Sequence, residues 1–304
     1  MSSAEIAIDV RGLRKAYGDF EAVAGIDLRI ERGEVFALLG PNGAGKTTTV
    51  EILEGHRKRD DGEVSVLGYD PGRSQRGFKE RIGIVLQETG VEPYLTVEET
   101  VELFGSFYPH PRPVDEVIEL VGLQEQRRMR VKKLSGGQQR RLDVAVGLAG
   151  DPDLLFLDEP TTGFDPAARR GAWEMVRGLQ HLGKTIFLTT HYMEEAQQLA
   201  GRVAIIDRGR IIAEGPPSSL IGAEPTTTIR FAPPANSIGL LEGLAANQRD
   251  GHVTIETREP TAVLYALTSR AQEAGIELDG LEVTRPSLED TYLRLVGEAE
   301  AVLE

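Results

Sequence analysis

The amino-acid sequence predicts an α/β fold with a mostly parallel sheet that is covered on both faces. Three observations indicate it: apolar runs of strand length recur along the chain, helical patterns separate them, and one run passes through a glycine-rich turn directly into a helix. Such continuous apolar runs are typical of buried parallel strands. The expected strands are residues 35–40, 81–87, 153–158 and 185–190, followed by a hairpin that turns at Arg208 and Gly209.

Helices are expected beside these strands. One follows the glycine-rich turn over residues 46–55, a second begins at Thr96, and two more cover 165–182 and 192–203. Between about 93 and 150 the pattern is helical only. This stretch therefore predicts a helical subdomain inserted between two strands of the sheet.

A change of pattern after Leu220 predicts two domains. Residues 1–222 form the larger one, and residues 223–304 form a small α+β domain behind a linker at 221–228. The segment from 226 to the C-terminus holds six basic and thirteen acidic residues, so it carries half of the net charge of −14. Its expected strands are residues 227–231, 252–257 and 276–283.

Composition excludes several classes of protein. The chain has no cysteine, which excludes disulfide frameworks and cysteine-based metal sites and fits a reducing compartment. Its first residues do not resemble a signal peptide, and its apolar runs fall well short of the roughly 20 residues that span a bilayer. We expect a soluble chain that reaches a membrane through a partner. The acidic charge disfavours nucleic acid; the basic cluster 127–133 is either a solvated loop or a face for an acidic partner or a lipid surface.

The glycine-rich turn, GPNGAGKTT, fits the phosphate-binding pattern G-x-x-x-x-G-K-[ST]. Its glycines allow backbone N–H groups to surround phosphates, and the helix N-terminus adds its dipole. Lys46 is expected to meet the β- and γ-phosphates, and the Thr47 hydroxyl is expected to bind Mg²⁺. The residues expected to contact the nucleotide are Gly40, Pro41, Asn42, Gly43, Ala44, Gly45, Lys46, Thr47 and Thr48.

Two carboxylates, Asp158 and Glu159, end a buried strand at the edge where open α/β sheets bind ligands. Asp158 suits a second, water-mediated contact to Mg²⁺. Glu159 is placed to polarise the attacking water. A solvated acid pair that closes a strand is the alternative, but the phosphate loop upstream favours the catalytic interpretation.

Three further side chains have both a structural and a functional interpretation. His191 ends an apolar strand and would lie beside Glu159 if the two strands are neighbours, where it could bind a γ-phosphate. Gln87 has the same placement after its own strand and could reach the metal or the water. Tyr17 is either an ordinary core or strand aromatic or a ring that stacks on adenine.

The segment LSGGQ at residues 134–138 opens a predicted helix. Ser135 and Gln138 have the spacing of a capping box, and Gly136 and Gly137 leave the first turn without side chains. Each glycine weakens a helix by about 1 kcal/mol relative to alanine. A bare helix N-terminus suits an anion, so these glycines indicate that a ligand approaches closely.

Together these motifs resemble the ATP-binding subunit of an ABC transporter over roughly residues 5–222. Seven motifs stand in the order of that family, and LSGGQ alone separates it from other proteins with a phosphate loop. The resemblance implies a P-loop NTPase (RecA-like) core with an antiparallel β part and an inserted helical subdomain. Where the family usually has Leu before the Asp of the loop after the acids, this chain has Phe164, and we expect altered packing there. The motifs are Tyr17, residues 40–48, Gln87, residues 134–138, residues 154–159, Asp165 and His191.

The resemblance also implies partners and roles. Two copies would face head to tail, with each ATP between one copy's phosphate loop and the other copy's Ser135, Gly136, Gly137 and Gln138. Glu159 would be the catalytic base, His191 the γ-phosphate sensor and Asp165 a contact across the dimer. The C-terminal segment 286–297 is similar to the ending of ATPases of ABC-2 type drug exporters. A separate membrane permease, export of a drug-like or lipophilic substrate, and a place on the cytoplasmic face of the membrane follow from this resemblance.

Alternative functions stay open at this point. These motifs do not indicate the direction of transport, so an importer subunit would have the same ATP-hydrolysing domain. An ABC ATPase that acts on nucleic acid or ribosomes usually carries two ATPase units, a coiled coil or zinc-binding cysteines, and this chain has one unit, no cysteine and an acidic charge. A nucleotide-gated regulator with little turnover is disfavoured because Glu159 and His191 are both present.

Overall fold

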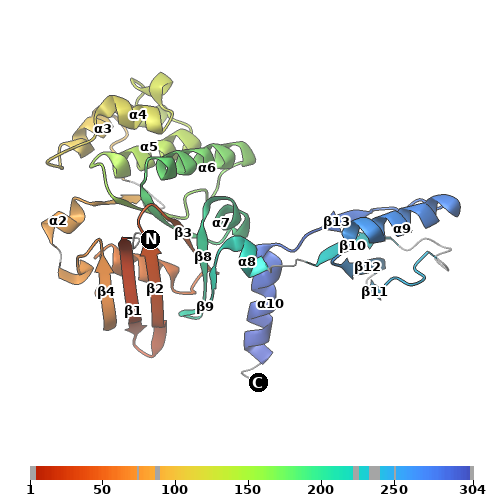
Figure 1. Cartoon of the computed structure of the whole chain (residues 1–304). Coiled ribbons are helices and arrows are strands. Elements are labelled where there is room, and N and C mark those ends of the chain that lie inside the picture. Colours follow the sequence, from red (N-terminus) through yellow and green to blue (C-terminus); the bar gives the residue numbers. More distant parts are fainter. Residues whose placement is uncertain are drawn as a thin grey trace. The chain divides into compact units, whose positions relative to one another are not determined.

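The computed structural model describes residues 5–73, 75–85, 90–221, 226–232, 240–249 and 251–301. The chain divides into two compact units, Met1–Pro217 and Ser218–Glu304, each with a hydrophobic core of its own (Figure 1). The domain boundary expected at residue 222 stays a prediction, because residues 222–225 lie outside the described chain.

A six-stranded sheet forms the centre of the first unit within the described residues. Its order is β5-β6-β7-β3-β8-β9, and each neighbouring pair is parallel except β8 and β9, which form the predicted hairpin. All residues of β3 are buried, as expected for a strand covered on both faces. The prediction of a mostly parallel sheet is therefore confirmed. The strands are β3 (Val35–Leu39), β5 (Ile82–Val85), β6 (Leu154–Asp158), β7 (Thr185–Thr190), β8 (Arg202–Asp207) and β9 (Arg210–Gly215).

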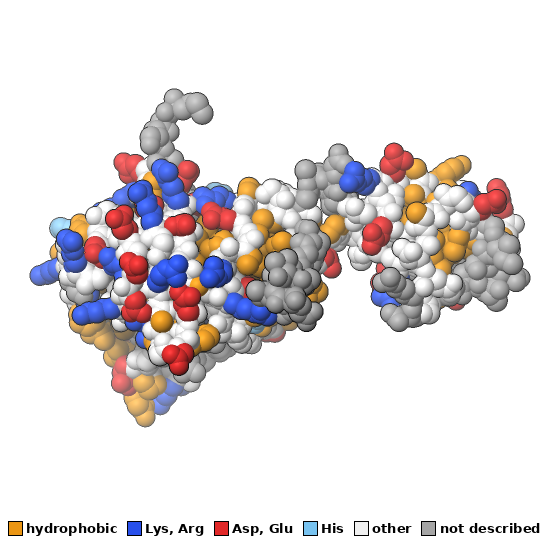
Figure 2. Space-filling model, turned by 90° about the horizontal axis from the view of Figure 1, so that it is seen from below, with side chains coloured by type: hydrophobic (Ala, Val, Ile, Leu, Met, Phe, Trp, Pro, Cys, Tyr) orange, Lys and Arg blue, Asp and Glu red, His pale blue; other side chains and the backbone are white. Residues whose placement is uncertain are grey.

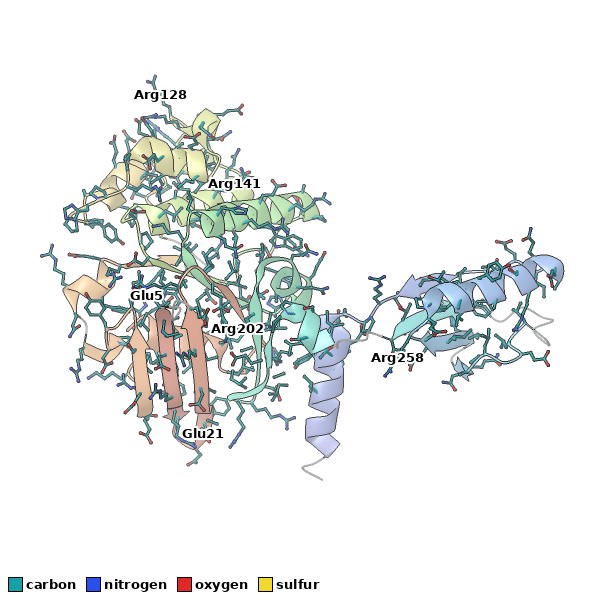
Figure 3. All side chains as sticks on the ribbon, in the orientation of Figure 1. Glu5, Glu21, Arg128, Arg141, Arg202 and Arg258 are labelled. Carbon is teal, nitrogen blue, oxygen red and sulfur yellow. The ribbon has the colours of Figure 1, made fainter. Side chains whose placement is uncertain are left out.

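An antiparallel sheet of order β2-β1-β4 packs with α1 (Lys46–Leu53) against one face of the parallel sheet, in a shared core. Arg202 joins the two sheets at their edge: its guanidinium lies 3.3 Å from the Glu34 carboxylate and donates a 2.9 Å hydrogen bond to the Arg29 carbonyl (Figure 3). The antiparallel strands are β1 (Ile6–Tyr17), β2 (Phe20–Glu31) and β4 (Asp61–Val66).

Helices α6 (Pro166–His181) and α7 (Met193–Leu199) pack on each other, and α7 also packs on β3 and β7. The short α2 (Arg76–Lys79) precedes β5. Between β5 and β6 the described chain is helical, with α3 (Val97–Gly105), α4 (Val114–Leu120) and α5 (Gly136–Leu148) in mutual contact, so the inserted helical subdomain is present (Figure 1). Thr96 caps α3 as predicted, and Glu99 completes a capping box.

The second unit contains an antiparallel sheet of order β11-β12-β10-β13 with α9 (Pro260–Glu273) packed on it. Short helix α8 (Pro217–Ile221) stands at its start, and α10 (Leu288–Ala301) begins behind the Ser287–Asp290 capping pair. The remaining strands are β10 (Thr227–Phe231), β11 (Ala246–Arg249), β12 (His252–Thr257) and β13 (Glu282–Thr284).

Two details of this unit differ from the sequence prediction. The strand expected over 276–283 is wrong for its first part, because a turn at Asp279 and Gly280 interrupts it; Gly280 has φ of +64°, and strand structure begins only at Glu282. Strand β11 was not predicted, because ANQR is polar and lacks alternation; it forms by pairing with β12 at the edge of the sheet.

Candidate active site

The phosphate-binding loop joins the end of β3 to the start of α1. Two of its glycines are required by close main-chain contacts: a Cβ on Gly40 would lie 2.3 Å from the Ile206 carbonyl oxygen, and one on Gly45 would lie 2.3 Å from the Ala22 carbonyl oxygen. Gly45 also has φ of +105°, which other residues rarely adopt. The local packing therefore accounts for glycine at both fixed positions of the pattern.

Lys46, the first residue of α1, folds its side chain back over this loop. Its Nζ donates hydrogen bonds to the carbonyl oxygens of Gly40 at 2.7 Å and Pro41 at 3.1 Å, and lies 3.8 Å from Glu159 Oε1. Burial lowers the pKa of Lys46, and the charges of Glu159 and Asp158 offset this only in part. The ammonium is thus held at the centre of the loop.

A cavity of about 180 Å³ lies between the phosphate loop and Glu159. Phe20 and Ala22 line it although the sequence did not single them out; Phe20 pairs directly with Tyr17 across the β1–β2 turn, so an aromatic at each end of a tight hairpin was the available signal. The lining residues are Tyr17, Phe20, Ala22, Pro41, Asn42, Gly43, Gly45, Lys46, Thr47, Thr48 and Glu159.

Tyr17, the last residue of β1, is 41% exposed, so it is a strand aromatic outside the core. Two cations approach its face: Lys15 Nζ lies 5.6 Å and Arg57 Cζ 5.3 Å from the ring centre. Arg57 also pairs with Glu51 on α1. This chain of contacts fixes the ring relative to the helix that follows the phosphate loop.

Asp158 and Glu159 stand where β6 ends, next to β7. The Thr189 hydroxyl, on β7, donates to the Asp158 carboxylate. The Glu159 backbone N–H donates to the Thr189 carbonyl oxygen at 3.1 Å, and Glu159 itself has φ of +45°, in the left-handed region. The main chain therefore turns sharply at Glu159 and directs its side chain to the cavity.

Three side chains surround the Glu159 carboxylate. His191 Nδ1 lies 3.1 Å from Oε1, and the Thr162 hydroxyl donates to Oε2 at 3.1 Å. Burial raises the pKa of this carboxyl, but the contacts with His191, Thr162 and Lys46 outweigh it and hold the pKa below the ordinary value for glutamate. Adjacent strands bring His191 and Glu159 together as the sequence predicted; Thr162 was not singled out.

The segment at the start of α5 forms the predicted capping box. The Ser135 hydroxyl accepts from Gln138 N at 3.3 Å, and the Gln138 side-chain oxygen accepts from Ser135 N at 2.9 Å. The chain's own packing does not require the glycines: a Cβ on Gly136 meets nothing within 4 Å, and one on Gly137 meets the Ala168 Cβ at an ordinary 3.6 Å. The space beside both residues is open to a ligand.

A second cavity, of about 260 Å³, lies between α5 and α6 beside this helix start. Phe164 and Ser135 both line it, so the aromatic residue in place of the expected Leu borders the same cavity as the start of α5. Arg140 also lines it, although the sequence did not single it out, and its Nε donates to the Pro160 carbonyl at 3.3 Å. Asp165 caps α6, since its carboxylate accepts from the N–H groups of Ala167 and Ala168.

For two of the predicted site residues, the role stays a prediction. Gln87 is outside the described residues. Asp165 is exposed, but its carboxylate serves the helix cap, and a contact across a dimer stays a prediction. Among the described helices, none is both long and apolar enough to cross a membrane.

Two family models match the chain. The ABC transporter model matches residues 23–162, and the model described as ABC transporter domain-containing protein-like, C-terminal domain, matches residues 227–287. The chain is 39% identical to daunorubicin resistance ATP-binding protein DrrA3 of Streptomyces coeruleorubidus, with 99% of each chain covered. It is 40% identical to Nod factor export ATP-binding protein I of Ralstonia nicotianae, over 95% of this chain and 94% of that protein.

Solved structures show the same fold. The cbiO1 structure from Clostridium perfringens, part of the ABC transporter complex cbiONQ, is 29% identical with a TM-score of 0.64, over 72% of this chain and 92% of that one. The ATP-binding cassette MJ0796, solved as a dimer in a post-hydrolysis state with ADP and Pi, is 26% identical with a TM-score of 0.62, over 69% and 98%. The chain therefore belongs to the ATP-binding proteins of ABC transporters, and it is an ATPase with a P-loop NTPase fold.

Proposed function

We propose that ATP binds in the cavity between residues 40–48 and Glu159, with Tyr17 stacked on adenine and Lys46 on the β- and γ-phosphates. One observation carries this proposal. The Glu159 carboxylate, fixed by its neighbours and ionised at neutral pH, faces the same cavity as the Lys46 ammonium 3.8 Å away. A general base and a phosphate-binding cation at this spacing fit hydrolysis of a terminal phosphate.

His191 supports the same reaction from its contact with Glu159. The imidazole orients the carboxylate and also reaches the γ-phosphate, so it links the base to the group it attacks. Glu159 accepts the proton of the attacking water in this proposal, and Gln87 helps to place that water or the metal. Lys46 compensates charge on the transferred phosphoryl group.

The donors at this edge fit Mg²⁺. The Thr47 hydroxyl lines the cavity and the Asp158 carboxylate ends β6, so both offer the hard oxygen ligands that Mg²⁺ prefers alongside water and phosphate. Mg²⁺, when bound, neutralises phosphate charge. The Thr189 hydroxyl fixes the orientation of the Asp158 carboxylate.

A second copy of the chain completes the site in this proposal. Gly136 and Gly137 leave open space beside a helix N-terminus that can bind an anion, and the chain's own packing does not need them. The γ-phosphate held by the other copy fills that space in a head-to-tail dimer. Ser135 and Gln138 stabilise the start of α5 through their capping box. Asp165, exposed at the start of α6, contacts the partner.

The transport role requires a membrane permease as a separate chain. The surface beside β5 and α3 suits such a partner: Leu103 and Phe107 are 44% and 67% exposed, and a cavity of about 260 Å³ opens next to Phe104 and Tyr108. Residues 1–222 act as the motor and residues 223–304 as an accessory domain. The protein then sits at the cytoplasmic face of the membrane through the permease.

Export is the direction we propose, with a drug-like or lipophilic cargo. The names of the two relatives, daunorubicin resistance and Nod factor export, support it. The described side chains on the face shown in Figure 2 mix both signs of charge over the first unit, which does not favour a nucleic-acid role there. Vesicles that contain the permease, with the ATPase, ATP and labelled cargo enclosed, should release the cargo only when the ATPase is active.

The decisive experiment compares Glu159→Gln with wild type. The variant should bind ATP with unchanged affinity and lose at least about a hundredfold in turnover, because general-base catalysis contributes 10²–10⁴-fold. Glu174→Gln, an exposed acid on α6, is the matched control and should retain full turnover. Wild-type hydrolysis by Glu159→Gln would refute the base assignment.

A further inference from the structure

A buried polar cluster lies outside the nucleotide cavity, next to the segment that follows Glu159. Its centre is Glu195 on α7, which is fully buried. The carboxylate faces the hydroxyls of Thr190 and Thr161 and the indole N–H of Trp173, with the Arg169 guanidinium beyond. Burial raises the pKa of Glu195 more than these neighbours lower it. We call these five residues the Glu195 cluster.

Thr190, Thr161 and Trp173 lie close enough to Glu195 to lower its pKa, but most polar atoms of the cluster miss ordinary hydrogen-bond geometry. Both oxygens of Glu195, the Thr161 hydroxyl, the Trp173 indole nitrogen and Arg169 Nε are buried without a hydrogen-bond partner of ordinary geometry. Each such group lowers the stability of the fold, and an apolar side chain at the position of Glu195 would be less unfavourable. In this conformation the carboxylate therefore works against stability.

The segments that meet at the cluster are those that carry the candidate active site. Thr161 stands two residues after Glu159 in the loop that leads to Asp165, and Trp173 belongs to α6, which that loop enters. Glu195 belongs to the helix that begins just after His191. A shift of the loop and α6 against α7 is what the contacts of Glu195 with Thr161 and Trp173 need to reach ordinary hydrogen-bond geometry.

We propose that Glu195 is a positioning residue for hydrolysis: it accepts hydrogen bonds from Thr161 and Trp173 when two copies close on ATP. These bonds join the loop that follows Glu159 to α7, the helix that begins just after His191, so that the base and the sensor keep their positions relative to each other. The inference rests on the proposed ATP sandwich, because closure of the dimer supplies the shift. This inference gives α7 a role in hydrolysis, whereas none of the sequence motifs lies in α7.

The test separates stability from turnover. Glu195→Leu should lower kcat at least about tenfold, leave the KM for ATP and the ATP affinity of the monomer within about twofold, and unfold at the same or a higher temperature than wild type. Glu195→Gln keeps one acceptor oxygen and should lose less turnover. Gln197→Leu, an exposed change on the same helix, is the control. A purely structural role predicts instead that melting temperature and kcat fall together.

A double-mutant cycle identifies the hydrogen bond itself. Thr161→Val should slow turnover alone, yet add little to Glu195→Leu, since both remove the same contact. Additive losses, unchanged turnover in Glu195→Leu, or a matching loss of stability would each overturn the inference. Glu159→Gln, assayed in the same series, tests the proposed base independently, so failure of one assignment is distinguishable from failure of the other.

Discussion

The Arg140 guanidinium, on α5, donates a 2.8 Å hydrogen bond to the backbone carbonyl oxygen of Asp158 at the end of β6. Arg140 is 8% exposed, and burial lowers its pKa against the opposing charge of nearby Asp143. A single buried side chain thus ties the helix that begins with the glycine pair to the strand that carries the candidate metal ligand.

Replacement of Arg140 should therefore affect both stability and turnover. Arg140→Ala removes the guanidinium hydrogen bonds to the carbonyl oxygens of Asp158 and Pro160, so we expect a loss of about 1–3 kcal/mol in the free energy of unfolding and a lower kcat. Chemical denaturation and steady-state ATPase assays measure the two effects. Arg170→Ala, an exposed change on α6, should alter neither quantity. An Arg140→Ala protein of wild-type stability would contradict this account of the contact.

The open space at Gly137 leads to a prediction about partner copies. Gly137→Asp places a carboxylate where we expect the partner's γ-phosphate, so hydrolysis and ATP-driven dimerisation should be lost while the monomer still binds ATP. The fold should tolerate the side chain, because a Cβ there makes only an ordinary contact. Gly137→Ala is the steric control. Light scattering with and without ATP measures dimerisation, and a persistent dimer would refute this interpretation.

Mixing two inactive proteins sharpens that test. In a mixed dimer of Lys46→Ala and Gly137→Asp copies, one composite site carries both changes and the other carries neither. Turnover should reappear on mixing if each site is built from two copies. A site built within one chain would show no recovery at any mixing ratio.

The Tyr17 ring should govern affinity for the base. Base–aromatic stacking contributes about 1–3 kcal/mol, so Tyr17→Ala should weaken ATP binding about 5- to 150-fold, and Tyr17→Trp should retain it. Arg57→Ala should give a smaller loss, because its guanidinium, 5.3 Å from the ring centre, only holds the ring in place. Titration with inorganic tripolyphosphate, which has no base, is the control and should be unaffected. Equal losses for both ligands would rule out stacking.

The buried carboxyl of Glu54 predicts how stability depends on pH. Burial and the charges of Asp158 and Glu51 raise its pKa to about 8, so the folded chain keeps a proton that the unfolded chain releases above about 4.5. Stability should therefore fall as pH rises between these values, by up to about 1.4 kcal/mol per pH unit. Urea unfolding from pH 5 to 9 measures this, and Glu54→Gln should remove the slope. If Glu54→Gln shows the same slope of stability against pH as wild type, the pH dependence comes from other groups.

Much of the fold follows from local sequence signals. The β3–loop–α1 unit combines an apolar run, glycines and a helix start, and each signal agrees with the others. The polar β11 carries no such signal, because it is held by pairing with β12. The turn at Gly280 interrupts a segment whose apolar residues alone favoured a strand. Edge strands and turns depend on neighbours that a local pattern does not contain.

The candidate site was predictable where residues belong to motifs. His191 and Glu159 meet because their strands are adjacent, which the strand order confirms. Thr162, Arg140 and Glu195 were not found, because each acts through a contact between distant elements. The signal for them was weak: a Thr, an Arg or a Glu inside a helix or loop usually faces solvent.

The left-handed backbone at Glu159, with φ of +45°, also determines which exchanges are informative there. β-Branched residues resist this conformation, whereas Asn and Asp tolerate it. Glu159→Val would thus combine a distorted main chain with a lost carboxylate, and its inactivity would have two causes. Glu159→Asp keeps the turn and shortens only the side chain, so it measures how far the carboxylate must extend for hydrolysis. Glu159→Asn has the length of Asp but carries a neutral amide, so the difference between the two variants measures the need for the carboxylate itself.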